Sequence, residues 1–341
     1  MVAALGAGRS PSFAAAESGS REALAGATHA RDDATRPPHA TDPARAPDHA
    51  HPTDHAHPTE HALAPLTSAA TTDAPHDSLP PIASEEKLGC AIEARGDGAH
   101  GVIELDRGVL LVPESTRGSY DLLLHFHGGT AVRSLLAPLA LGLVVRTIDA
   151  GQGSQRYAGA VATAAELEAI LASVDVALAP AKRRHLVVSA WSAGYGAVRE
   201  LAGHSPGLAS AYVLLDSVHT SYEPDGTTLE PAGLVPFEAL ADGAVAGAPL
   251  VVLTHSSIRP PGYASTSEVA DALIAHVGGR RSYGGLAPTS GIELMTRFDR
   301  GAFHVRGYTG TGKEAHCAEL RLLPLVLEGD VLPYLARLPV R

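Results

Sequence analysis

Short, continuous apolar runs recur along the chain, and they constrain its fold more than any other feature. Continuous rather than alternating hydrophobicity is typical of strands that are covered on both faces. Amphipathic helical stripes lie between the runs, over residues 167–178 and 269–277. This alternation predicts an α/β fold with three layers and a doubly wound, mostly parallel sheet. Strands are expected over 108–112, 121–126, 141–145, 185–189, 211–215 and 249–253, with a last pair near 291–296 and 302–305.

The composition of the chain changes abruptly near Pro80. Residues 1–80 contain a single aromatic residue, Phe13, and are rich in Ala, Pro, Thr, His and Asp. Such a segment cannot bury enough apolar area to offset the roughly 1–2 kcal/mol per residue that backbone ordering costs. We therefore expect a disordered tail over 1–80, followed by one α/β domain over 84–341.

A histidine-rich repeat lies within the tail. The hexapeptide at 48–53, Asp-His-Ala-His-Pro-Thr, is repeated at once at 54–59. Imidazoles beside carboxylates can bind Zn, Cu or Ni loosely, which is one interpretation of the repeat. The interpretation that we favour is a low-complexity sequence without a role, because no folded frame fixes a coordination geometry.

Charge and composition exclude several classes of protein. The chain carries 26 basic and 37 acidic residues, whereas a dedicated nucleic-acid binder should carry a basic excess. No run approaches the ~18 apolar residues of a membrane-spanning helix. Residues 1–16 lack the basic start and continuous apolar core of a secretion signal, so we expect a soluble protein and leave its localisation open. Cys90 and Cys317 allow at most one disulfide, and their spacing does not decide whether they pair.

The most specific local pattern is a strand that passes directly into a helix over residues 186–198. The turn between them reads Ala190-Trp191-Ser192-Ala193-Gly194, with the serine at its apex. Small residues two positions before and after the serine let the strand and the helix approach each other. This is the nucleophile-elbow pattern G-x-S-x-G with alanine in place of the first glycine. The alternative is a buried serine in a turn of small residues.

A second predicted strand ends in His127-Gly128-Gly129, about two βαβ units before Ser192. Backbone N–H groups of Ala193 and of Gly128 or Gly129 could then hold the oxyanion of an acyl-transfer reaction. With this loop and the elbow together, the chain resembles the α/β-hydrolase superfamily, specifically its esterase, lipase and peptidase members. The resemblance covers roughly residues 100–338.

The resemblance implies a catalytic histidine after the last strand and before the final helix. His316 occupies this position in a glycine-rich segment, and it follows Ser192 in the family's chain order. His304 is the weaker alternative because it falls in a predicted strand. His219 and His255 also follow strands and are candidate substrate contacts.

The acid departs from the common pattern of this superfamily. Its usual position follows the strand at 249–253, but residues 254–256 read Thr-His-Ser and include no carboxylate. Asp216 ends the preceding strand, as in the pancreatic-lipase-like branch, and is our prediction for the acid. Asp225 and Asp299 are the reserves.

These roles predict a serine hydrolase that cleaves an ester, thioester or amide in a small acyl substrate, without a cofactor. His316 would take the proton of Ser192, the serine would attack the acyl carbon, and Asp216 would orient the imidazole. One rival is a metal-dependent hydrolase built on His125 and His127, which point to the same side of a strand. Another is an α/β-hydrolase fold that only binds its ligand.

Two long connections remain without a role. Residues 220–248 are long enough to form a small lid over a site at the strand ends. Residues 278–290 carry Arg280, Arg281 and Tyr283. These side chains could bind an anionic group, although solvated surface arginines are the more common case.

Overall fold

The fold is known from a computed structural model that describes residues 90, 92, 98, 100–284 and 290–339. The predicted tail over 1–80 and its histidine-rich repeat lie outside these residues. The described strands form one mixed sheet in the order β1-β2-β4-β3-β5-β6-β7-β10-β9-β8. They are β1 His100–Leu105, β2 Gly108–Pro113, β3 Ser119–Phe126, β4 Leu143–Ile148, β5 Lys182–Trp191, β6 Ala211–Leu215, β7 Leu250–His255, β8 Ser282–Tyr283, β9 Leu294–Arg300 and β10 Phe303–Tyr308.

Parallel pairing dominates the centre of this sheet. Neighbouring strands run parallel from β4 through β3, β5, β6 and β7 to β10. The strands at both edges are antiparallel. Every residue of β4, β6 and β7 is buried, which explains the continuous apolar runs in the sequence.

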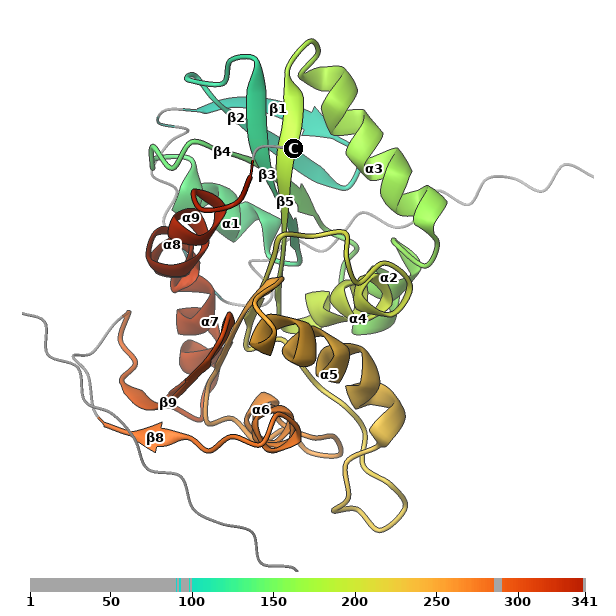
Figure 1. Cartoon of the computed structure of the whole chain (residues 1–341), viewed down its shortest axis with the longest axis vertical. Helices are drawn as coiled ribbons and strands as arrows, with labels where there is room; N and C mark the ends of the chain where they lie inside the picture. Colours follow the sequence, from blue (N-terminus) through green and yellow to red (C-terminus); the bar gives the residue numbers. More distant parts are fainter. Residues whose placement is uncertain (1–89, 91, 93–97, 99, 285–289, 340–341) are drawn as a thin grey trace, which may run out of the picture. The chain divides into compact units, whose positions relative to one another are not determined.

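Helices cover both faces of the sheet and complete the three layers. Figure 1 shows α1, α7, α8 and α9 on one side of the sheet and α2 to α5 on the other. This arrangement confirms the predicted three-layer α/β fold with a doubly wound, mostly parallel sheet. The helices are α1 Gly129–Leu136, α2 Ser154–Gly159, α3 Ala164–Ala177, α4 Tyr195–His204, α5 Pro231–Val245, α6 Thr266–His276, α7 Lys313–Arg321, α8 Leu323–Val326 and α9 Leu332–Leu335, with the short turns η2 Ser192–Gly194 and η3 Leu327–Val331.

Local sequence explains where the two longest predicted helical stripes begin. α3 starts at a capping box in which Thr163 and Glu166 each bind the other's backbone N–H. Ser265 and Glu268 form the same reciprocal pair at the start of α6. Each box satisfies N–H groups that have no partner within the helix.

Two differences from the predicted strands have a physical cause. β1 was not predicted, because this edge strand has mostly exposed or half-exposed residues and so lacks a continuous apolar run. β4 extends to Ile148 because the buried Arg146 and Thr147 continue it, and the Arg146 guanidinium donates to the carbonyls of Thr147 and Asp106. Polar residues inside a strand end the run that the sequence pattern detects.

The prediction of a lid over residues 220–248 is wrong for the second half of that segment. Residues 231–245 form α5, a crossover helix between β6 and β7, and Leu234, Phe237 and Leu240 on it are buried. A helix that buries this many large side chains is part of the core rather than a movable cover. The loop before α5, with its bridge between Tyr222 and Leu229, and residues 246–248 after it lie outside the helices and the sheet.

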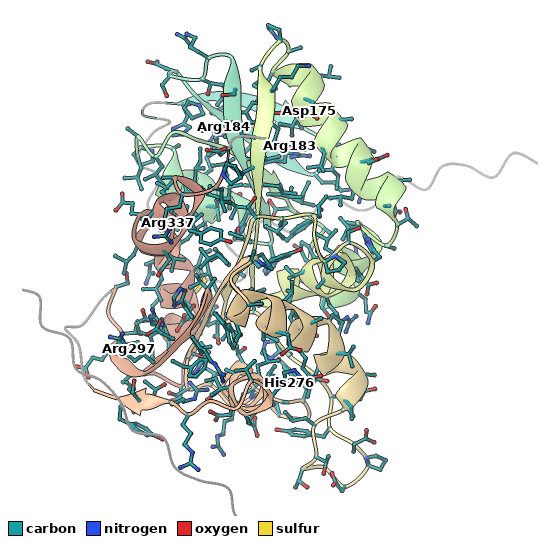
Figure 2. The ribbon with its side chains drawn as sticks, viewed as in Figure 1. Asp175, Arg183, Arg184, His276, Arg297 and Arg337 are labelled. Carbon is teal, nitrogen blue, oxygen red and sulfur yellow. A yellow bond between two sulfur atoms is a disulfide. The ribbon has the colours of Figure 1, made fainter. Side chains whose placement is uncertain are left out.

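Ion pairs and one disulfide tie segments that are distant in sequence. At the start of β5, Arg183 lies 3.4 Å from Asp175 of α3 (Figure 2). Arg184 lies 2.6 Å from Asp121 of β3. Cys90 and Cys317 form a disulfide, which the cysteine spacing had left open. Among the described residues, no helix is both long enough and apolar enough to cross a membrane.

Candidate active site

Ser192 lies on a strained turn between β5 and α4. Its φ angle is 50°, in the left-handed region that residues other than glycine rarely adopt. A Cβ atom on Gly194 would lie 2.2 Å from the carbonyl oxygen of Phe126, and one on Gly196 would lie 2.0 Å from that of Ser154. Both positions therefore require glycine, because the elbow packs directly against β3 and α2.

Asp216 and His316 form a hydrogen-bonded pair at the carboxyl ends of the strands. Asp216 directly follows β6, and its Oδ2 lies 2.7 Å from Nδ1 of His316 on α7. The backbone N–H of Ser256 donates to Oδ1 at 3.1 Å, and its hydroxyl donates to Oδ2 at 2.8 Å. Burial raises the pKa of Asp216, but the hydrogen bonds from His316 and Ser256 outweigh burial and hold the pKa below its ordinary value.

Sequence reasoning assigned no role to Ser256. It directly follows β7, and its two hydrogen bonds hold the carboxylate of Asp216, which follows the neighbouring strand β6. A small hydroxyl residue at that position, in place of a carboxylate, was the signal for this role. The reserve acids lie elsewhere: Asp225 caps its own exposed loop through Thr228, and Asp299 pairs with His304 at 2.6 Å.

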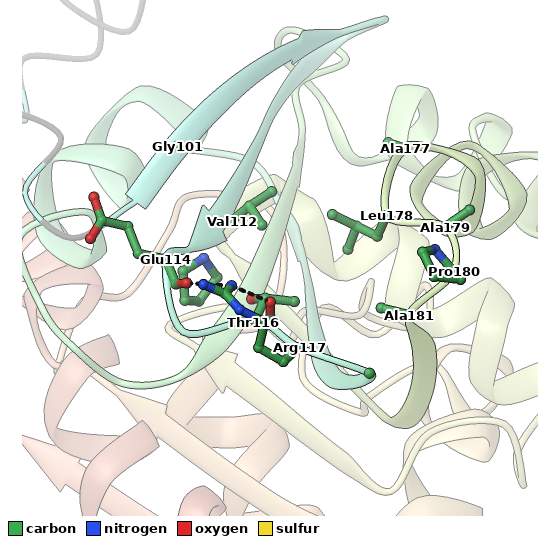
Figure 3. A pocket seen from close by; sticks show the side chains of 12 residues that line it. Gly101, Val112, Glu114, Thr116, Arg117, Ala177, Leu178, Ala179, Pro180 and Ala181 are labelled. Atoms are coloured by element: carbon green, nitrogen blue, oxygen red, sulfur yellow. Dashed lines mark hydrogen bonds between the residues drawn. The ribbon is translucent and has the colours of Figure 1, made fainter.

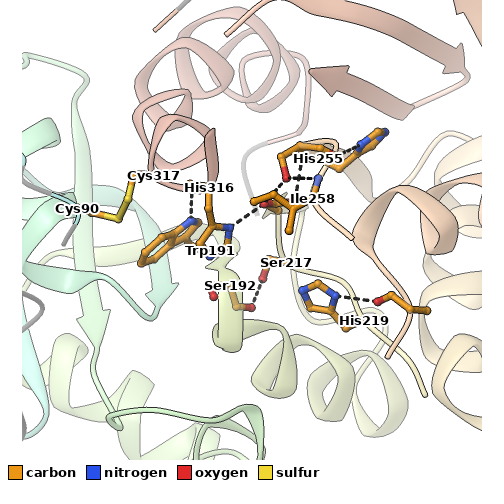
Figure 4. Close-up of polar contacts among 12 residues, drawn as sticks. Cys90, Trp191, Ser192, Ser217, His219, His255, Ile258, His316 and Cys317 are labelled. Carbon is orange, nitrogen blue, oxygen red and sulfur yellow. Dashed lines mark hydrogen bonds and ion pairs between the residues drawn. A yellow bond between two sulfur atoms is a disulfide. The ribbon is translucent and has the colours of Figure 1, made fainter. Parts of the chain in front are cut away.

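Trp191 links the elbow to the histidine. Its indole N–H donates to the carbonyl oxygen of His316 at 3.0 Å, and the two ring centroids are 4.8 Å apart. Figure 4 shows Ser192, Trp191 and His316 together, with Ser217 beside the elbow. The hydroxyl of Ser217 donates to the carbonyl oxygen of Ser192 at 2.9 Å. The structure thus brings the elbow serine to the same strand ends as the Asp216–His316 pair.

His127 packs on the Trp191 ring. The two rings are stacked with centroids 5.1 Å apart, and Nδ1 of His127 lies 2.7 Å from the hydroxyl of Tyr157. That hydroxyl donates to the carbonyl of Gly151, so it accepts from His127 Nδ1–H and leaves Nε2 without a proton. Burial first, and then the charge of His316, lower the pKa of His127 to about 4. His127 is therefore uncharged at neutral pH.

Of the two glycine N–H groups in the loop after His127, one is bonded within the protein and the other has no partner among the described residues. The N–H of Gly129 donates to Oδ1 of Asp149 at 3.1 Å. Gly128 has a φ of 88°, and its N–H has no hydrogen-bond partner among the described residues. Ala193 lies in the first turn of the elbow helix, where N–H groups have no partner within the helix. Gly128 and Ala193 are therefore better placed than Gly129 to donate to a ligand.

His125 does not form a metal site with His127. Its Nδ1 lies 2.6 Å from the hydroxyl of Ser189, and its Nε2 lies 2.7 Å from the carbonyl oxygen of His127. Both ring nitrogens are thus committed to the protein, and burial lowers the pKa of His125 to about 3. Within the described part of the chain, no group of three or more His, Cys, Asp or Glu side chains could hold a metal ion.

A further set of hydrogen bonds holds Ser256 and, through it, the carboxylate of Asp216. His255 donates from Nδ1 to the carbonyl oxygen of Ser256 at 2.8 Å, and Nη1 of Arg281 lies 2.5 Å from its Nε2. Arg281 also donates to Asp271 at 2.5 Å. Burial first, and then the charge of Arg281, lower the pKa of His255 to about 4, so it stays neutral and accepts from the guanidinium. The guanidinium of Arg281 therefore binds groups of the protein itself and not an external anion.

A cavity of about 590 Å³ lies away from this site (Figure 3). Its lining includes Gly118, which precedes β3, and Ala181, which precedes β5. These are the amino ends of the parallel strands, whereas Ser192 and Asp216 follow carboxyl ends. Ligands of open α/β sheets bind outside the carboxyl ends, so we assign this cavity no role in the chemistry.

No family model and no curated protein matches the chain. Solved structures to which it is similar include ferric enterobactin esterase from Salmonella typhimurium, with 12% identity, a TM-score of 0.41, and 70% of this chain and 61% of that chain covered. Est1E from Butyrivibrio proteoclasticus is 13% identical with a TM-score of 0.37, over 70% of this chain and 100% of that chain. FAE is 13% identical with a TM-score of 0.43, over 74% of this chain and 92% of that chain. The chain thus spans about three fifths of the enterobactin esterase.

Proposed function

We propose that the protein is a serine hydrolase that cleaves carboxylic esters of small molecules through an acyl-enzyme on Ser192. The same chemistry extends to thioesters and amides. The observation that carries the proposal is the Asp216–His316 hydrogen bond of 2.7 Å beside a serine on a strained elbow. A left-handed serine between a strand and a helix exposes its hydroxyl to an incoming substrate.

His316 is the general base in this mechanism. Its Nδ1 faces Asp216, so Nε2 is the nitrogen that takes the proton of the Ser192 hydroxyl as the serine attacks the acyl carbon. The ionised Asp216 fixes this tautomer and stabilises the imidazolium that forms. His316 then returns the proton to the leaving alcohol and activates a water molecule, which releases the acid.

The oxyanion is stabilised by backbone N–H groups on both sides of the serine. Ala193 supplies one and Gly128 the other, because the N–H of Gly129 already donates to Asp149. Loss of one such donor in other acyl-transfer enzymes lowers kcat by about 10²–10³-fold. The neutral His127 beside Trp191 adds no charge at this position.

Covalent labelling tests the proposal directly. A fluorophosphonate probe is expected to label Ser192, with the site identified by peptide mass spectrometry. Ser192→Ala should abolish labelling and lower kcat on p-nitrophenyl esters by about 10³-fold or more without unfolding the protein. The matched control is Ser205→Ala, at the far end of α4, which should label and turn over as the wild type does.

The rival functions give different outcomes. A non-catalytic binding protein would not label and would not hydrolyse any ester, thioester or amide. A metal-dependent hydrolase would retain activity within tenfold in Ser192→Ala and lose it on treatment with a chelator. Either result would overturn the assignment of Ser192 as nucleophile.

A further inference from the structure

Three aromatic side chains cluster beside the elbow, and the proposed mechanism uses none of them. The ring of His219 packs edge-to-face with Tyr195, at a centroid distance of 5.4 Å and an angle of 74°. It packs in the same way with Tyr263, at 5.1 Å and 90°. We call Tyr195, His219 and Tyr263 the aromatic shelf.

The chain places the aromatic shelf next to Ser192. Tyr195 is the first residue of α4 and directly follows the short turn η2 that begins at Ser192. His219 comes two residues after Ser217, whose hydroxyl donates to the carbonyl oxygen of Ser192 (Figure 4). The charges of Asp216 and His316 both act on His219, as expected for a side chain close to the pair.

The three side chains of the aromatic shelf are uncharged, and Tyr263 is exposed whereas Tyr195 and His219 are half-buried. The guanidinium of Arg199 lies 6.0 Å from the ring centroid of Tyr195. His219 donates from Nδ1 to the carbonyl oxygen of Ala264 at 3.0 Å, and burial lowers its pKa, so the ring is neutral. Tyr263 has a large, mostly apolar side chain, yet 43% of the residue is exposed to solvent. The hydroxyls of Tyr195 and Tyr263 have no hydrogen-bond partner among the described residues. Rings with free hydroxyls can pack against an aromatic group and bind oxygen atoms on its edge.

We infer that the aromatic shelf binds an aromatic ring of the ester substrate, within reach of the scissile carbonyl. This inference rests on the proposed function. Aromatic groups favour edge-to-face and offset contacts with one another. Each such contact strengthens binding by a factor of about 2 to 12 relative to a saturated group of the same size. A long aliphatic group or a carboxylate would gain none of these contacts. The ring can belong to the acyl or to the alcohol part of the ester.

The test is a comparison of matched substrates. Methyl 3-phenylpropanoate against methyl 3-cyclohexylpropanoate probes the acyl side, and 2-phenylethyl acetate against 2-cyclohexylethyl acetate probes the alcohol side. We expect the aromatic member of one pair to have a kcat/KM about tenfold higher than its saturated partner. Tyr263→Leu should reduce that ratio to near one, whereas Tyr263→Phe should keep it because the ring remains.

A tyrosine outside the aromatic shelf provides the matched control. Tyr283 of β8 is 83% exposed, and Tyr283→Leu should leave both the ratio and the absolute rates unchanged. Ratios near one for both pairs in the wild type would overturn the inference while leaving Ser192 as nucleophile. Absence of any ester hydrolysis, together with absence of fluorophosphonate labelling, would overturn the proposed function and this inference with it.

Discussion

Nδ1 of His316 lies 2.7 Å from Oδ2 of Asp216, across 100 positions of sequence. Asp216 follows β6 and His316 begins the second turn of α7, so the contact depends on the adjacent strands β6, β7 and β10 being in register. Ser256, which directly follows β7, donates twice to the carboxylate of Asp216. The carboxylate of Asp216 thus follows one strand and is held by the residue that follows the next strand.

Asp216→Asn is expected to keep the fold and to lower kcat on esters by up to about 10⁴-fold. The amide can still accept from Ser256, but it no longer enforces the tautomer that leaves Nε2 of His316 free to accept the serine proton. Steady-state kinetics with a p-nitrophenyl ester measure the effect, and circular dichroism checks the fold. The control is Asp225→Asn, on an exposed loop, whose kcat should stay within threefold of the wild-type value. Full activity in Asp216→Asn would reassign the acid.

Arg281→Met is expected to lower kcat about tenfold with little change in KM. Arg281 does not touch the reacting groups; it acts as a positioning residue, because it holds His255 and through it the carbonyl of Ser256. Loss of this contact loosens Ser256 and lets Asp216 shift away from His316. The matched control is Arg280→Met, since the neighbouring arginine is exposed. Equal kcat values for the two variants would contradict the positioning role.

Strand and elbow positions followed from sequence because each depends on local pattern. β6 has the predicted bounds, and the strand–turn–helix around Ser192 is formed by a strand with buried side chains and glycines that no larger residue can replace. Asp216 was predicted from the absence of a carboxylate after residues 249–253, and the structure brings it to His316. The strand positions, the elbow and Asp216 could therefore be predicted from residue patterns within one or two strands and helices.

Contacts between distant segments could not be predicted in the same way. Arg281 was assigned to a solvated loop, yet tertiary packing directs it inward to His255. The Cys90–Cys317 pairing and the aromatic shelf also depend on the final arrangement of elements rather than on periodicity. The edge strand β1 was missed because it is half exposed and lacks the apolar run of a central strand.

Acidification is expected to destabilise the protein well before the carboxylates are protonated. Burial lowers the pKa of His125 from 6.5 to about 3, so below pH 6.5 the unfolded chain binds a proton there that the folded protein does not. The free energy of unfolding should therefore fall with pH from about 6.5 towards 3, by up to about 1.4 kcal/mol per pH unit for this residue. His127 and His255 add to this fall down to about pH 4.

Urea unfolding at pH 7.5, 6.0 and 5.0 measures this dependence. His125→Gln keeps a donor near the carbonyl of His127 but cannot bind the proton, so its free energy of unfolding should depend less steeply on pH than that of the wild type. Ser189→Ala removes a hydrogen-bond partner of His125 without removing the histidine, and it should lower stability while keeping a steep slope. Identical slopes in wild type and His125→Gln would contradict the assignment.

Reduction of the Cys90–Cys317 disulfide is expected to lower the melting temperature by at least about 5 °C. The bond closes a loop across 227 positions, and a crosslink of that span removes conformational entropy from the unfolded chain worth on the order of 2–5 kcal/mol. Cys317 is next to His316, so the freed α7 should also lower kcat on esters. Differential scanning calorimetry with and without dithiothreitol measures the first effect. Cys90→Ala should reproduce the low melting temperature and show no further response to dithiothreitol; an unchanged melting temperature on complete reduction would mean that packing alone holds α7 in place.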